Sequence, residues 1–111
     1  MASLDDLLKI DGVAAAGEWA ADGKLVDYKA NMDMSQEMAA MSAQFCATVT
    51  MLFNTLAGSF AESGQMNWVP QQGWMYAGGD WTVAVGGNRS VFVETSKADF
   101  NELFRVLVGN R

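Results

Sequence analysis

Residues 38 to 61 contain no charged side chain, and they carry the longest regular pattern in the chain. Large apolar residues recur there at spacings of three and four, which is typical of one face of an α-helix. Ser35 is suited to cap this helix, and Ser63-Gly64 to end it. The pattern predicts one long helix over residues 35–63 whose apolar stripe lies on a sheet. The stripe consists of Met38, Met41, Phe45, Val49, Leu52, Leu56 and Phe60.

The opposite side of this helix carries small, uncharged residues in place of the Lys and Glu that usually face water. Because the apolar stripe already occupies the helix against the sheet, we expect the small side to meet a second copy of the chain in a two-fold dimer. The alternative is that alanine is simply a good helix former on a wet surface. The helix residues of the expected dimer interface are Ala39, Ala43, Ala47, Thr50, Asn54, Ala57 and Ala61.

The 24 uncharged residues from 38 to 61 are long enough to cross a bilayer. Several Ser, Thr, Asn and Gln side chains are scattered among them, and the flanks lack basic anchors. Because polar groups are costly in hydrocarbon, we expect no membrane insertion.

Five strands are predicted on the two sides of the long helix. Residues 13–20 and 24–30 flank Asp22-Gly23, which is a strong hairpin signal. Residues 72–78, 81–86 and 90–95 are separated by two further glycine-rich turns. Short helices are expected at both ends, the first capped by Ser3 and the last, over residues 97–108, capped by Ser96. This order predicts a single α+β domain over residues 1–111: a five-stranded antiparallel sheet with the long helix on one face and the terminal helices on the other.

The predicted strand 72–78 is rich in aromatic residues and carries no Lys or Glu. If it lies at the outer edge of the sheet, such an edge risks uncontrolled pairing. We expect Trp74, Met75, Tyr76 and Ala77 to pair with the same strand of a second copy. The alternative is a small-molecule-sensing domain whose aromatic pocket draws on Trp68, Trp74 and Trp81, although convergent polar groups that would orient a ligand are not evident.

The sequence gives no indication of catalysis or of a cofactor or metal site. It contains no His, and one Cys cannot build an ordinary zinc site. Cys46 borders the apolar stripe, so we expect a buried, inert thiol. The glycine pairs lack the following helix that a phosphate site needs. Glu18 and Asp27 face each other across the first hairpin, where solvated surface charge is favoured over acid–base chemistry.

Charge and targeting features indicate where the chain works. Its net charge of -6 argues against nucleic acid and against docking on an anionic membrane. The single cysteine favours a reducing compartment, and the N-terminus MASLDDLLKI lacks the pattern of a secretory signal. We therefore expect a cytoplasmic protein.

The segment LLKIDGVAAAGEWAADGKLVDYKA resembles the opening of the roadblock/dynein light-chain superfamily, and the later elements follow the same order. The motifs GEW, DGKL, MNW, GGDW and VFVETSKADFNELF resemble a prokaryotic roadblock-like family of unknown function, seen also in sulfur oxidisers. The resemblance implies a profilin-like fold, a homodimer with a shared ten-stranded sheet, and no catalysis. It further implies an adaptor or regulator of a protein partner, such as a small GTPase or a sulfur-metabolism complex. No residue role can be carried over from it.

Overall fold

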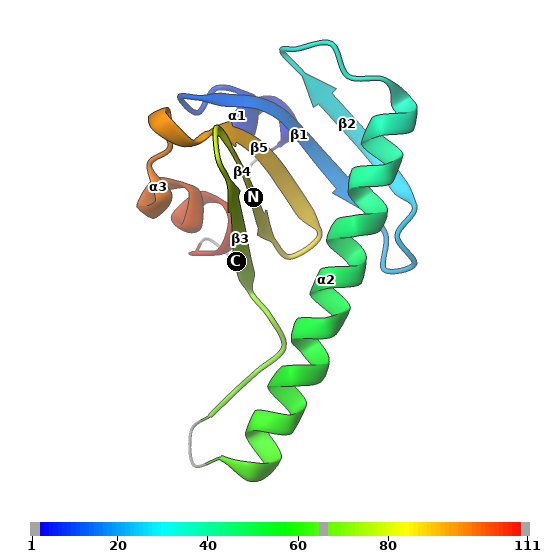
Figure 1. The fold of residues 1–111 in the computed structure, drawn as a ribbon, viewed down its shortest axis with the longest axis vertical. Helices are drawn as coiled ribbons and strands as arrows, with labels where there is room; N and C mark the ends of the chain where they lie inside the picture. The colour runs from blue at the N-terminus through cyan, green and yellow to red at the C-terminus, as the bar shows by residue number, and fades with distance from the viewer. Residues whose placement is uncertain (1–2, 65–66, 110–111) are drawn as a thin grey trace.

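The computed structural model describes residues 3–64 and 67–109, which form one five-stranded antiparallel sheet with helices on both faces (Figure 1). The strands lie in the order β2-β1-β5-β4-β3, so β2 and β3 are the two edges. This confirms the predicted fold and the position of the aromatic strand at an edge. The strands are β1 (Val13–Trp19), β2 (Leu25–Ala30), β3 (Gly73–Gly78), β4 (Trp81–Gly86) and β5 (Arg89–Glu94).

The predicted hairpins are present, and glycine conformation explains two of the turns. Gly23 and Gly79 have φ angles of 90° and 87°, a region that other residues rarely adopt. In the first turn the Asp22 carboxylate accepts a hydrogen bond from the Lys24 N–H at 3.0 Å. The register of β1 and β2 shifts between Glu18 and Trp19.

The short terminal helices cover one face of the sheet. Helix α1 (Leu4–Leu8) is capped by Ser3, whose hydroxyl accepts from the Asp6 N–H while the Asp6 side chain accepts from the Ser3 N–H. Together with helix α3 (Phe100–Phe104) it encloses an apolar core against β1, β4 and β5. The fully buried members of this core include Leu7, Ala84, Val91, Val93 and Leu103.

Helix α2 (Gln36–Ser63) lies on the other face of the sheet and begins after the predicted cap Ser35, whose hydroxyl accepts from the Met38 N–H. Its N-terminal half crosses β1 and β2, whereas its C-terminal half extends beyond the sheet (Figure 1). The core on this side combines Trp19 and Val85 of the sheet with Ala43, Cys46 and Ala47 of the helix. The segment 67–72 then returns toward β3 (Figure 1).

The prediction had the two faces of α2 reversed. Its buried residues are Ala39, Ala43, Cys46, Ala47, Thr50 and Ala57, so five of the seven helix residues expected at a dimer interface pack inside their own chain. Asn54 and Ala61 are exposed. Small side chains let the helix approach the sheet closely, and large sheet residues such as Trp19 fill the space between them. The apolar stripe, expected on the sheet, is largely exposed.

The C-terminal region also differs from the prediction in one respect. Residues Thr95–Lys97 form a short 3-10 turn, and the following helix begins only at Phe100. Its cap is Asp99, whose carboxylate accepts from the Glu102 N–H at 3.1 Å, whereas we expected Ser96. The helix continues as a wider π turn over Arg105–Gly109. Asp99 is well suited to cap this helix because its carboxylate accepts from a free N–H of the first turn and its negative charge is favoured by the helix dipole.

Candidate functional site: an apolar surface on helix α2 and strand β3

The apolar stripe of α2 is an unusual feature of the surface that the described residues form. Met41 is 66% exposed and Leu52 is 61% exposed, and these are high values for large apolar side chains. Met38, Phe45, Leu56 and Phe60 are exposed as well, and Val49 is half-buried. Monomeric proteins rarely leave contiguous apolar patches of this kind in water. The stripe is therefore a candidate contact surface.

Trp74 connects this stripe to strand β3. Its indole N–H donates to the Thr50 hydroxyl at 3.0 Å, which anchors the ring on the middle of α2. Phe45 and Phe53 contact the same ring edge-on, with centroids 6.1 and 5.8 Å away. Such aromatic contacts add to the free energy gained from burial alone. They place the stripe and the β3 edge on the same side of the molecule.

The outer side of β3 offers unpaired backbone groups. Among the described strands β3 is paired only with β4. The Gly87 N–H donates to the Gln72 carbonyl, and the direction of the N–H groups alternates along an antiparallel strand. Counting from this pair, the N–H groups of Met75 and Ala77 point away from β4. The aromatic, uncharged strand thus lies at the edge of the sheet, and Met75, Tyr76 and Ala77 are exposed on it. Its pairing with a second copy stays a prediction.

Two of the three tryptophans near this edge line a common groove. Trp68 packs against Phe60 with ring centroids 4.9 Å apart. A groove of about 360 Å³ lies beside them, lined also by Phe53, Trp74 and Phe104. Trp81 lines a different hollow, together with Asp80 and Glu94. The structure thus divides the predicted aromatic cluster into a pair and a separate residue.

The structure shows the surroundings of the three ionisable residues that were singled out in the sequence, Cys46, Glu18 and Asp27. Burial raises the pKa of the Cys46 thiol to about 11, and a hydrogen bond from Ser90 partly offsets this. The expected buried thiol is confirmed. Glu18 and Asp27 are register partners, as expected, and Glu18 lies 3.7 Å from the Arg89 guanidinium. In residues 3–64 and 67–109 no group of three potential metal ligands occurs.

None of the helices in the described ranges has both the length and the apolar character needed to cross a membrane. The polar residues scattered along α2 account for this, since its mean hydropathy falls short of that of a membrane span.

The order of elements, with a long helix between a β-hairpin and a three-stranded meander, is characteristic of one known fold. It is the fold of roadblock/LC7 domains, as the comparison with solved structures shows. The chain itself belongs to a family described as "Uncharacterized conserved protein (DUF2173)", whose model matches residues 3–108. Both parts of the expected resemblance, to the roadblock fold and to a family of unknown function, are confirmed.

Three solved structures illustrate this similarity. Myxococcus xanthus MglB has a TM-score of 0.71 and 11% identity, with 90% of this chain and 77% of that chain covered. A roadblock/LC7 domain from Streptomyces avermitilis has a TM-score of 0.71 and 12% identity, covering 89% and 79%. The gliding protein MglB from Thermus thermophilus has a TM-score of 0.72 and 13% identity, covering 90% and 73%. No curated protein matches the chain. At these identities the similarity establishes the fold and leaves the role open.

Proposed function

We propose that this chain is a non-catalytic homodimeric adaptor or regulator of the roadblock type. The observation that carries the proposal is the exposed apolar stripe of α2 beside the free edge of β3. Pairing of the β3 edges across a two-fold axis would satisfy the N–H groups of Met75 and Ala77 and extend the sheet through both copies. The two stripes would then lie close enough to cover each other.

This arrangement changes one part of the expected interface and keeps the other. Trp74 to Ala77 stay in the proposed interface, whereas the large stripe residues replace the small face of α2. A structure titled "MglB with tetrameric arrangement", with a TM-score of 0.69 and 13% identity, is an example of self-association in one protein with this fold and supports the proposal. Surface outside the dimer would recruit a protein partner of a different kind.

Sedimentation equilibrium tests self-association directly. We expect a dimer at micromolar concentration, with dissociation on dilution. A monomer at every concentration up to hundreds of micromolar would contradict the proposal.

The adaptor role is tested separately, with the dimer as bait in extracts of the native host. A protein captured by the dimer but not by an unrelated dimeric bait supports the adaptor role, and repeated failure to capture any protein argues against it.

The 360 Å³ groove beside Trp68 favours one second candidate, a domain that senses a small apolar molecule. The volume falls within the range of ligand pockets, and Gln71 brings a polar group to the wall. Native mass spectrometry of the chain purified from its host separates the two candidates. A bound small molecule that is lost in Trp68→Ala supports the sensor, whereas a dimer of two unmodified chains supports the adaptor.

A further inference from the structure

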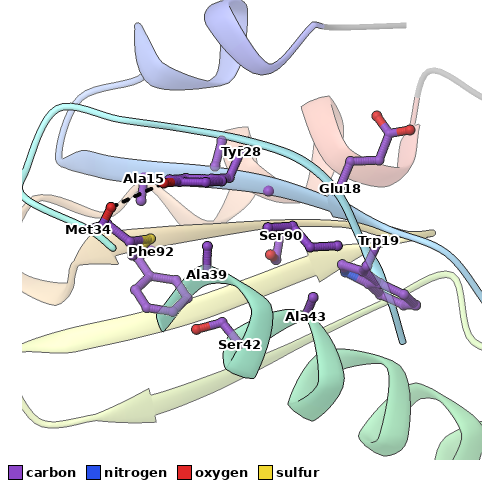
Figure 2. A pocket seen from close by; sticks show the side chains of 13 residues that line it. Ala15, Glu18, Trp19, Tyr28, Met34, Ala39, Ser42, Ala43, Ser90 and Phe92 are labelled. Atoms are coloured by element: carbon purple, nitrogen blue, oxygen red, sulfur yellow. Dashed lines mark hydrogen bonds between the residues drawn. The ribbon is translucent and has the colours of Figure 1, made fainter. Parts of the chain in front are cut away.

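A small cavity lies between the N-terminal half of α2 and the sheet (Figure 2). Its walls come from β1, β2, β5 and α2. About 20 Å³ of it is open to a water-sized sphere. On this measure a single water molecule needs roughly 10–15 Å³. The cavity is therefore large enough for one water and too small for a metabolite.

Trp19 brings an unpaired hydrogen-bond donor to this cavity. The residue is 4% exposed, and its indole Nε1 is buried without a partner among the described residues. Figure 2 shows the ring nitrogen on the side of the indole turned toward Ser90. Buried polar groups are hydrogen-bonded in the great majority of native structures, by protein or by ordered water. The other tryptophan packed between the sheet and α2, Trp74, has its N–H bonded to Thr50.

The hydroxyl groups around the cavity can accept hydrogen bonds. The Ser42 hydroxyl already donates to the Met38 carbonyl at 3.0 Å, and the Tyr28 hydroxyl donates to the Met34 carbonyl at 3.3 Å. Their hydrogens are used, but each oxygen keeps capacity as an acceptor. Ser90 is buried at the same site and its hydroxyl interacts with the Cys46 thiol. Figure 2 shows the Ser90 side chain beside Trp19, whereas the Tyr28 hydroxyl lies at the Met34 end of the cavity. Ser90 is therefore the acceptor best placed for a water bound to the indole N–H.

We propose that this cavity binds one ordered water molecule, which accepts from Trp19 Nε1–H and donates to the Ser90 hydroxyl oxygen. Such a water links β1 to β5 through hydrogen bonds on the side of the sheet that faces α2. The proposal does not depend on the dimer.

Gly17 offers a conservative way to remove the water. It lines the cavity, and a Cβ at this position would lie 3.6 Å from the Ser90 Oγ and 3.9 Å from the Asp27 carbonyl oxygen. These are ordinary van der Waals distances, so Gly17→Ala fits without displacing its neighbours. Its methyl group occupies space that the water needs, while Trp19 stays unchanged.

The test is a water–protein NOE measurement on the ¹⁵N-labelled chain. We expect a cross-peak between the Trp19 indole proton and a long-lived water, and its loss in Gly17→Ala. Magnetic relaxation dispersion of water should count one fewer long-lived water per chain in Gly17→Ala, and also in Trp19→Phe, which removes the donor. No cross-peak in the natural sequence, or an unchanged water count in both variants, would overturn the proposal.

Discussion

At the scale of single residues, side-chain size decides what α2 can touch. Ala43 and Ala47 are buried against Trp19 and Val85, so a charged side chain there would be held out of water. Ala40, beside them in the sequence, is exposed. These alanines are similar in the sequence and differ only in what the fold places opposite them.

Ala47→Glu is expected to destabilise the fold of the single chain, not merely its assembly. It buries an unpaired carboxylate, which costs about 3 kcal/mol or more. Urea unfolding followed by far-UV circular dichroism measures this loss. Ala40→Glu introduces the same group at an exposed position and should stay within about 0.5 kcal/mol of the natural chain. Equal stability of the two variants would show that Ala47 is not in the core.

Cys46 should give the stability a distinct dependence on alkaline pH. Burial raises the pKa of its thiol from 9.0 to about 11. Since the unfolded thiol ionises first, stability from this group is complete below pH 9 and is lost as pH rises from 9 to 11. The loss is on the order of 2 kcal/mol. Urea unfolding at about pH 8 and about pH 11 should therefore show a larger drop for the natural chain than for Cys46→Ala, and equal drops would contradict the burial.

At the scale of elements, α2 has two uncharged sides, and only one of them meets the sheet. The buried side is small, and the exposed side carries the stripe of large apolar residues. An exposed position tolerates a change without loss of the fold, so the stripe can be tested separately from the core.

Leu52→Glu should convert the dimer to a folded monomer. Leu52 is 61% exposed in the single chain, so the carboxylate of the introduced Glu remains hydrated in the monomer. The proposed dimer would bury this carboxylate in both of its chains. Sedimentation velocity reports the mass, and circular dichroism reports the fold. Ala40→Glu is the matched control, because it adds the same charge to α2 outside the stripe. A Leu52→Glu chain that remains dimeric would exclude the stripe from the interface.

Neighbouring amides of strand β3 should differ in their rates of hydrogen exchange. The N–H groups of Met75 and Ala77 should exchange slowly in the dimer and faster on dilution, because in the proposed dimer they pair with a second copy. Those of Trp74 and Tyr76 face β4 and should be protected at every concentration. Met75→Pro removes an outward donor and should weaken the dimer while the β3–β4 ladder survives. Fast exchange of Met75 and Ala77 at all concentrations would identify a free edge.

At the scale of the whole molecule, stability and assembly should be linked. A dimer that forms only from folded chains is stabilised by mass action, so its Tm rises with concentration. A tenfold increase should raise Tm by a few degrees for a chain of 111 residues. Differential scanning calorimetry measures this shift, and Leu52→Glu should abolish it. A Tm that is independent of concentration in both chains would speak against a dimer.

The sequence alone determined the elements and their order. Asp22-Gly23 and the later glycine turns specify hairpins because few other residues adopt their backbone angles, and Ser35 specifies the start of α2 through its own side chain. These signals are local, so each can be recognised within a few residues. The burial of Cys46 was also predicted, but from its place beside the apolar stripe, which is the exposed side of α2; the thiol is buried because it lies next to the small side that packs on the sheet.

Only the tertiary structure decided which side of α2 faces the sheet. Charged residues usually identify the side of a helix that faces water, but residues 38–61 carry no charge. The spacing of the large apolar residues predicts that they share one side of the helix, and it does not show what that side contacts. The sheet settles the question because Trp19 and Val85 fill the volume that large helix residues would need. The unpaired indole N–H of Trp19 arises from the same long-range packing, between residues far apart in the chain, and no local pattern encodes it.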